Sequence, residues 1–330
     1  MTKPAVLVTG ATGLIGRQLP APLSALGFKV IATSRRGGGD LVAMDCLDPS
    51  SVGAVMERLR PSHLIHLAWH DGAKDRWSSS ANLDWVGASL ALLSAFARSG
   101  GRRAVMVGSC AEYDWSQAAG GPLREDAALC PATLYGAAKV ATGTAALAGA
   151  GALGVSLAWA RPFFCYGPGE PEGRLFGDLI KGIAAGRTVE CTDGLQRRDF
   201  LQTEDLARAL AELLASPVEG AVNVASDNAV PVRDVIMALA RDLGHPERVN
   251  LGARARPAGA APRAAAAAAR PRSRSGGACA ALAAGRIPRP GLGAARAVLG
   301  AQPTGIEDRQ VERDAECGTT RRRHRSCSRS

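Results

Sequence analysis

Three kinds of feature are missing from this sequence of 330 residues, and each absence narrows the possible functions. Its eight cysteines show no paired CxxC spacing, so we expect reduced thiols, a cytoplasmic protein and no metal site. The most apolar stretch, residues 144–160, is interrupted by glycines and predicts a helix end followed by a strand, so no membrane association is expected. No basic region and apolar run precede the first predicted strand, so we expect no secretory signal.

Net charge is nearly absent from most of the chain. The formal net charge is +10, yet residues 253–330 alone hold 16 Arg, no Lys and 5 acidic residues. The first 252 residues are therefore close to neutral. The run Arg321-Arg322-Arg323-His324-Arg325 could contact phosphates, but no aromatic residue or recognisable motif accompanies it. We therefore expect no nucleic-acid partner.

Residues 253–330 also lack the regular apolar periodicity of the preceding chain. Ala, Arg, Gly and Pro make up 52 of these 78 residues, and none is aromatic. We interpret this tail as an out-of-frame reading of a GC-rich gene or as a disordered basic extension. Such a composition should not bury enough apolar surface to fold alone. Resequencing the gene distinguishes the two interpretations.

The first predicted strand runs directly into a turn with three spaced glycines. Gly10 permits the tight turn, Gly13 lets the backbone approach a pyrophosphate, and Gly16 lets the following helix pack close to the strand. The N–H groups at a helix N-terminus favour the pyrophosphate charge. The pattern predicts a dinucleotide site, although it also occurs in plain connections. Besides the glycines, the predicted cofactor contacts here are Thr12, Leu14 and Ile15.

Up to residue 252, short β-branched runs alternate with longer helical segments, which predicts an α/β, doubly wound parallel (Rossmann) sheet. We expect a cofactor domain over 1–165, with later returns near 195–225, and a smaller interleaved substrate domain over 166–252. The expected strands are 5–9, 29–33, 41–44, 64–67, 104–108 and 155–160. The expected helices are 14–26, 51–59, 82–99 and 135–149.

The end of the second expected strand selects between NAD and NADP. An acidic residue there would bind the ribose 2′-hydroxyl of NAD, whereas arginine accommodates the 2′-phosphate of NADP. This chain has Arg35 and Arg36 there, and no carboxylate before Asp40. We therefore favour NADP, with NAD as the alternative. The other interpretation is that both arginines are surface residues without a binding role.

Three residues suggest the catalytic chemistry. The i,i+4 spacing of Tyr135 and Lys139 places a phenol and an ammonium on one helix face. We expect the lysine charge to lower the pKa of Tyr135 from about 10 toward neutral pH. At the end of the fifth expected strand, Ser109 could hydrogen-bond the substrate oxygen that Tyr135 protonates.

Together these motifs resemble the extended short-chain dehydrogenase/reductase family, which contains nucleotide-sugar epimerases, dehydratases and reductases. The resemblance covers roughly residues 4–250, through TGxxGxxG at 9–16, HLA at 66–68, Ser109, YxxxK at 135–139 and the segments 161–169, 194–200 and 222–224. It implies that Asp45 lies near the adenine and that Leu67 and Ala68 line the cofactor cleft. It also implies that Lys139 holds the ribose and that Arg198 contacts a substrate phosphate.

Two positions depart from the family pattern. Phe164 stands where many members have an asparagine that helps to bind the substrate, and Cys110-Ala111 stand where sugar 4,6-dehydratases have an acid and base pair. An alternative alignment places Cys110 at the catalytic hydroxyl and keeps Glu112 as a possible base. We prefer Ser109 because a thiol is a poor hydrogen-bond donor to a sugar oxygen.

The favoured function is NADPH-dependent reduction of a keto group on a nucleotide-linked sugar. The first alternative is an epimerase or dehydratase, and a non-catalytic NADP-binding regulatory protein is the alternative from another class. The resemblance implies a possible homodimer through the helices 82–99 and 135–149. It also implies a final strand and helices after about residue 250, which are not legible here, so low activity or instability is expected.

Overall fold

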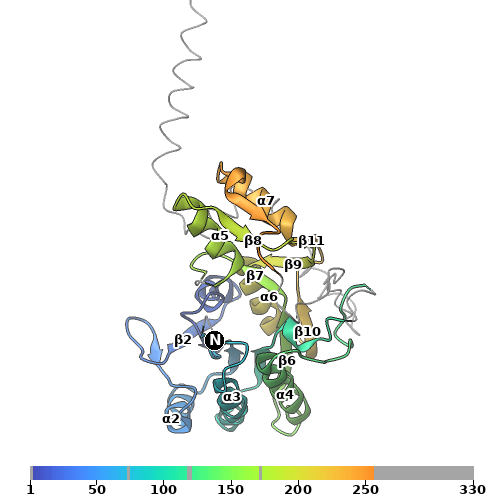
Figure 1. The fold of residues 1–330 in the computed structure, drawn as a ribbon. Helices are drawn as coiled ribbons and strands as arrows, with labels where there is room; N and C mark the ends of the chain where they lie inside the picture. Colours follow the sequence, from blue (N-terminus) through green and yellow to red (C-terminus); the bar gives the residue numbers. More distant parts are fainter. Residues whose placement is uncertain (1–2, 73–74, 117–120, 171–172, 256–330) are drawn as a thin grey trace, which may run out of the picture.

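The computed structural model describes residues 3–72, 75–116, 121–170 and 173–255 (Figure 1). Seven strands form a parallel central sheet in the order β10-β6-β5-β4-β1-β2-β3. The predicted α/β class with a doubly wound parallel sheet is confirmed. The strands of this sheet are β1 (Ala5–Thr9), β2 (Lys29–Ser34), β3 (Val42–Ala43), β4 (His63–His66), β5 (Arg103–Val107), β6 (Ser156–Pro162) and β10 (Gly220–Val224).

Helices cover both faces of the sheet because its strands alternate their side chains between two apolar cores. In β1, Val6 and Val8 pack into one core while Leu7 packs into the other. The first core is closed by α1 (Pro20–Ala25) and α6 (Thr203–Ala215). The second is closed by α2 (Pro49–Leu59), α3 (Ala81–Arg98) and α4 (Leu134–Gly149), which stand in a row in Figure 1.

A smaller part of the chain sits beyond one side of this sheet (Figure 1). It has its own apolar core, a three-stranded sheet in the order β11-β9-β7 and a two-stranded sheet of β12 and β8. Its elements are β7 (Phe164–Tyr166), α5 (Leu175–Ala184), β8 (Val189–Cys191), β9 (Arg197–Gln202), β11 (Ala229–Pro231), α7 (Val232–Asp242) and β12 (Val249–Leu251). The domain boundary that we predict at residue 165 falls within β7.

One predicted helix is wrong in its first half. In place of a continuous helix over 14–26, the chain forms turns, a 3-10 helix η1 (Gly16–Gln18) and then α1. Pro20 and Pro22 lack the N–H groups that would bond back to this segment, so a regular α-helix begins only at Pro20. The other predicted helices and strands lie within a few residues of the observed bounds.

No helix among the described residues is long and apolar enough to cross a membrane. Nearly all of the tail at 253–330 lies outside the described residues, so our interpretations of it stay predictions.

Candidate active site

The turn after β1 packs so closely against neighbouring backbone that Gly10 and Gly16 have no space for a side chain. Gly10 has a φ of +67°, and a Cβ on it would lie 2.8 Å from the backbone nitrogen of Ala68. A Cβ on Gly16 would overlap the carbonyl oxygen of Gly10. Gly13 donates its N–H to the same carbonyl at 3.0 Å. The turn is therefore held against the end of β4, with Leu67 and Ala68 beside it, and it fits the close approach of a dinucleotide backbone; that these two residues line the cofactor cleft stays a prediction.

A buried hydrogen-bond chain holds Leu67 and Ala68 at this turn. The Thr9 hydroxyl accepts from the backbone N–H groups of both residues at 3.2 Å and lies 2.7 Å from Nδ1 of His66. Nε2 of His66 lies 2.8 Å from the hydroxyl of Ser89 on α3. Burial and the nearby Lys139 lower the pKa of His66 to about 3. His66 is therefore neutral, and we infer that its single ring proton sits on Nε2, because Thr9 donates to Nδ1.

The arginines expected to select NADP follow β2, and Asp45, expected near the adenine, follows β3. Arg35 and Arg36 follow β2 directly and are both exposed, so their guanidinium groups are accessible to a phosphate. Asp45 follows β3, and its carboxylate accepts from the N–H of Leu47 at 3.0 Å. These positions agree with a dinucleotide site at this edge, but the contacts themselves stay predictions.

Arg17 is a residue of this turn that the sequence analysis missed. Its guanidinium donates to the carbonyl oxygens of Gly13 at 3.1 Å and Thr12 at 3.3 Å. The guanidinium of Arg17 also occupies the space beside Gly169, so that a Cβ added to Gly169 would overlap it. The signal was present in the sequence, since an arginine immediately follows the third glycine.

The three predicted catalytic residues come from two neighbouring elements. Ser109 follows β5, whereas Tyr135 and Lys139 lie in the first turns of α4, which Thr133 caps by accepting from the N–H of Gly136. The hydroxyls of Ser109 and Tyr135 are hydrogen-bonded to each other. The structure thus brings together the phenol and the hydroxyl that the sequence predicts to meet one substrate oxygen.

Two tryptophans that the sequence analysis did not single out surround Tyr135. The rings of Trp77 and Trp69 meet the Tyr135 ring edge-on, with centroids 5.4 Å and 6.4 Å away. The carbonyl of Trp77 accepts from the N–H of Tyr135 at 3.2 Å. Trp69 follows the HLA segment at the end of β4, a position from which it could have been suspected. These rings exclude water from one side of the phenol.

The predicted lowering of the Tyr135 pKa is wrong. Burial raises the pKa of Tyr135 to about 12, even though the hydrogen bond from Ser109 acts in the opposite direction. The ammonium of Lys139 does not reach the phenol: it donates to the carbonyl of Val107 at 2.8 Å and lies 3.6 Å from the ring centroid of Trp69. The phenol therefore holds its proton at neutral pH.

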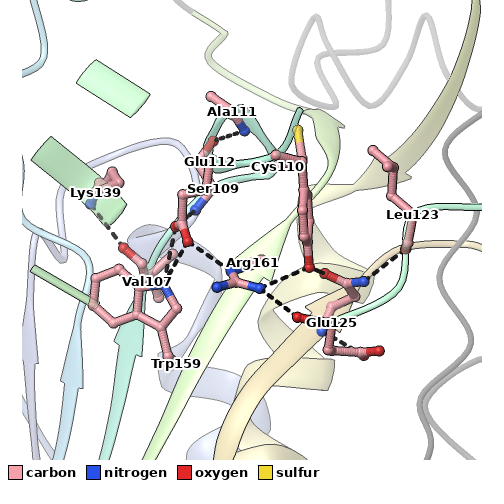
Figure 2. Close-up of polar contacts among 12 residues, drawn as sticks. Val107, Ser109, Cys110, Ala111, Glu112, Leu123, Glu125, Lys139, Trp159 and Arg161 are labelled. Atoms are coloured by element: carbon pink, nitrogen blue, oxygen red, sulfur yellow. Dashed lines mark hydrogen bonds and ion pairs between the residues drawn. The ribbon is translucent and has the colours of Figure 1, made fainter. Parts of the chain in front are cut away.

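The Glu112 carboxylate is occupied rather than free, as Figure 2 shows. It accepts from the N–H of Ser109 at 2.8 Å, from the indole of Trp159 at 3.0 Å and from Nε of Arg161 at 2.7 Å, and it is fully buried. Because every one of these donors is protein, Glu112 is badly placed to act as the base of a dehydratase.

The alternative assignment of Cys110 as the catalytic group also loses support. Cys110 packs in an apolar cluster with Tyr113, Leu123 and Phe163. Burial raises the pKa of its thiol to about 12. A buried, protonated thiol in apolar surroundings is a weak hydrogen-bond donor, which favours Ser109.

The predicted phosphate ligand, Arg198, lies on β9 in the smaller part of the molecule. Its guanidinium sits 4.9 Å from the ring centroid of Trp115 and 5.3 Å from that of Phe164. Trp115 in turn donates its indole N–H to the backbone carbonyl of Cys110, the residue after Ser109, at 2.9 Å. Phe164, which replaces the family's asparagine, thus supplies a ring face to the arginine instead of an amide to a ligand.

Among the described residues, no group of three or more His, Cys, Asp and Glu is arranged to hold a metal ion.

Comparisons with known proteins address the family and the fold of this chain. The model of the NAD dependent epimerase/dehydratase family matches residues 6–225. A dTDP-4-dehydro-6-deoxy-D-allose reductase from Streptomyces is 29% identical over 77% of this chain and 86% of its own length. A 3-diazoavenalumate denitrifying reductase from Streptomyces is 30% identical over 78% of this chain and 86% of its length. A solved structure of MoeE5 with UDP-glucose and NAD is 27% identical, with a TM-score of 0.65 over 80% of this chain and 88% of that one.

Proposed function

The chain belongs to the NAD-dependent epimerase/dehydratase family, enzymes of the extended short-chain dehydrogenase/reductase type, and we propose that it reduces a keto group of a nucleotide-linked sugar with NADPH. The observation that carries the proposal is the phenol of Tyr135, hydrogen-bonded to Ser109 and packed against Trp69 just after β4. Reduction of a ketone needs a proton donor at the carbonyl oxygen, and a phenol, which is protonated at neutral pH, can serve as that donor.

Each residue has a separate part in this reaction. The bound cofactor supplies the hydride that forms the new C–H bond at the carbonyl carbon. Tyr135 transfers its phenolic proton to the carbonyl oxygen, and Ser109 orients that oxygen by donating a hydrogen bond. Lys139 would hold the cofactor ribose, and its ammonium, although it makes no contact with the phenol, is a positive charge 5.9 Å from the Tyr135 ring centroid that favours the phenolate at longer range. Trp69 and Trp77 limit the access of water to the phenol.

The preference for NADPH rests on the end of β2. Exposed Arg35 and Arg36 can pair with a 2′-phosphate, and no carboxylate stands there to accept from a ribose 2′-hydroxyl. NADPH also suits a net reduction better than NAD does. NAD is the alternative, and MoeE5 was solved with it.

The substrate proposal rests on Arg198 and on the relatives. A guanidinium that lies over the rings of Trp115 and Phe164 is suited to a phosphate of a nucleoside diphosphate. The allose reductase named above acts on a dTDP-linked keto sugar, as its name states. Dehydration is less favoured, because Glu112 is occupied, and epimerisation is the first alternative.

An aromatic acid is the second candidate substrate. The 30% identical relative is named for 3-diazoavenalumate, not for a sugar nucleotide. The replacement of asparagine by Phe164, together with Trp115 and Arg198 around it, favours a flat anionic molecule at the same position.

We further propose that the protein acts in the cytoplasm as a homodimer. The helices α3 and α4 pack side by side, and Leu83 on α3 is exposed. An apolar side chain exposed at that place suits contact with a second copy.

The test is consumption of NADPH by the full chain with a panel of nucleotide-linked 4-keto sugars and with 3-diazoavenalumate. We expect Tyr135→Phe to lower turnover by about 100-fold or more, because the proton donor is removed while the ring is kept. Tyr166→Phe is the matched control: Tyr166 stacks on Phe176 in the smaller core and should keep its turnover. Equal turnover in Tyr135→Phe and in the unmodified chain would remove Tyr135 from the mechanism.

A further inference from the structure

Glu112 is a buried carboxylate for which the proposed reaction has no direct use. It lies in the 3-10 helix η2 (Cys110–Glu112), between the end of β5 and the predicted catalytic residues on α4. Its Oε2 atom pairs with Arg161 at 2.7 Å, and both side chains are almost completely buried. Burying such a pair costs free energy unless its remaining atoms are hydrogen-bonded, so its position needs a reason.

The pair is fully embedded in hydrogen bonds (Figure 2). The Nη1 atom of Arg161 donates to the hydroxyl of Tyr113 at 3.0 Å and to the backbone carbonyl of Glu125 at 3.1 Å. The Tyr113 hydroxyl donates to Oδ1 of Asn223 at 2.6 Å. Glu112 is therefore fixed from the side that faces away from Ser109 and Lys139.

Glu112 fixes the backbone that presents Ser109. Its Oε1 atom accepts from the N–H of Ser109, while the Ser109 hydroxyl accepts from the N–H of Ala111 at 3.1 Å, a reciprocal capping box. A Cβ on Gly108 would overlap Oε1 of Glu112 and the indole of Trp159. Glycine at 108 therefore makes room for the carboxylate directly behind the serine.

Glu112 also balances the charge of Lys139. Burial lowers the pKa of Lys139 to about 7, and the negative charge of Glu112 opposes that change. The other titratable groups around this ammonium are His66 from β4 and Tyr135 from α4. Both are neutral near pH 7, since their pKa values are about 3 and about 12. Arg161 on β6 pairs with the far oxygen of Glu112.

We propose that Glu112 is a positioning residue of the reductase: its carboxylate holds the backbone that presents Ser109 and favours the charged form of Lys139. The inference rests on the proposed function, because it assumes that Ser109 and Lys139 serve catalysis and cofactor binding.

The experiment measures NADP⁺ affinity of the full chain between pH 5.5 and 9, by the quenching of tryptophan fluorescence. A charged Lys139 favours binding, so affinity should fall as pH rises through the pKa of Lys139, and Lys139→Met should abolish that step. Glu112→Gln removes the negative charge and should move the midpoint down by about one pH unit. Arg161→Lys disturbs the same contact but keeps both charges, so it should leave the midpoint in place.

Glu112→Asp separates the two roles and also serves if Glu112→Gln does not fold. It keeps the charge but shortens the side chain, so the midpoint should stay while turnover falls about 10-fold through loss of the bond to Ser109. A Glu112→Gln midpoint equal to that of the unmodified chain, or full turnover in Glu112→Asp, would overturn the inference. Failure of the unmodified chain to bind NADP⁺ or NAD⁺ would instead contradict the proposed function.

Discussion

Gly16 shows how much a single methyl group matters in the cofactor turn. A Cβ there would overlap the backbone of Gly10 and Ala11, which cannot move without opening the turn. We expect Gly16→Ala to lose about 1–3 kcal/mol of stability and at least about 10-fold in NADP⁺ affinity. Thermal unfolding and a fluorescence titration measure the two effects.

Gly53 offers the matched control for this prediction. It lies within α2, and a Cβ on it would meet nothing within 4 Å. Gly53→Ala should therefore gain about 0.5–1 kcal/mol of stability and leave cofactor affinity unchanged. Unaltered NADP⁺ binding in Gly16→Ala would show that the turn does not approach the dinucleotide.

At the same scale, the closeness of Ser109 and Tyr135 was predictable from the sequence, but the electrostatics of these side chains were not. The spacing of Tyr135 and Lys139 and the place of Ser109 at a strand end are local features of the sequence. The pKa of Tyr135 depends instead on burial, and the direction of the Lys139 side chain depends on the Val107 carbonyl and the Trp69 ring. Those partners meet only in the folded chain.

At the scale of elements, the hydrogen-bond chain from Thr9 through His66 to Ser89 links β1, β4 and α3. Because His66 is part of it, the stability of the fold depends on pH. The folded chain keeps His66 neutral down to about pH 3, whereas the unfolded chain takes up the proton near pH 6.5. Above pH 6.5 both states are neutral at this group. As pH falls below 6.5, the free energy of unfolding should decrease by up to about 1.4 kcal/mol per pH unit from this residue.

Urea unfolding at pH 7 and pH 5 measures this dependence. His66→Gln should show a shallower decrease, because the group that titrates is gone, while His245→Gln, at a partly exposed position after α7, should behave like the unmodified chain. Burial and the nearby Arg103 also lower the pKa of His63. His63 therefore adds to the pH dependence of stability in the same direction, and it is present in both variants. An unchanged pH dependence in His66→Gln would mean that His66 is not held neutral.

Helices in the first 150 residues were largely predictable from the sequence, whereas α5, α6, α7 and the central-sheet strand β10 were not predicted, although those three helices are clearly amphipathic. The helices α2, α3 and α4 lie close to their predicted bounds, and α2 buries Val52, Val55 and Met56 at helical spacing. The helix over 14–26 was predicted too long, although Pro20 and Pro22 stand in the sequence as a warning. Strands of three residues such as β7, β8 and β11 depend on pairing with distant segments, which a single sequence does not reveal.

At the scale of the whole molecule, two parts of the chain have different tasks. The parallel sheet places the glycine turn, Ser109 and Tyr135 at the C-terminal ends of its strands, where ligands of such sheets bind. The smaller part contributes Arg198 from β9, which lies over Trp115, and Trp115 donates to the carbonyl of Cys110 directly after Ser109. A keto reductase needs both, one part for the hydride donor and the other for the substrate.

The most direct test of this account follows a hydrogen atom. The full chain is incubated with a nucleotide-linked 4-keto sugar and NADPH deuterated at C4 of the nicotinamide, in both stereoisomers, and the product is analysed by mass spectrometry. The account predicts one deuterium on carbon in the product from one of the two stereoisomers, with one NADPH consumed for each product formed. Conversion of the sugar without net NADPH consumption and without deuterium in the product would contradict it and point to epimerisation or dehydration.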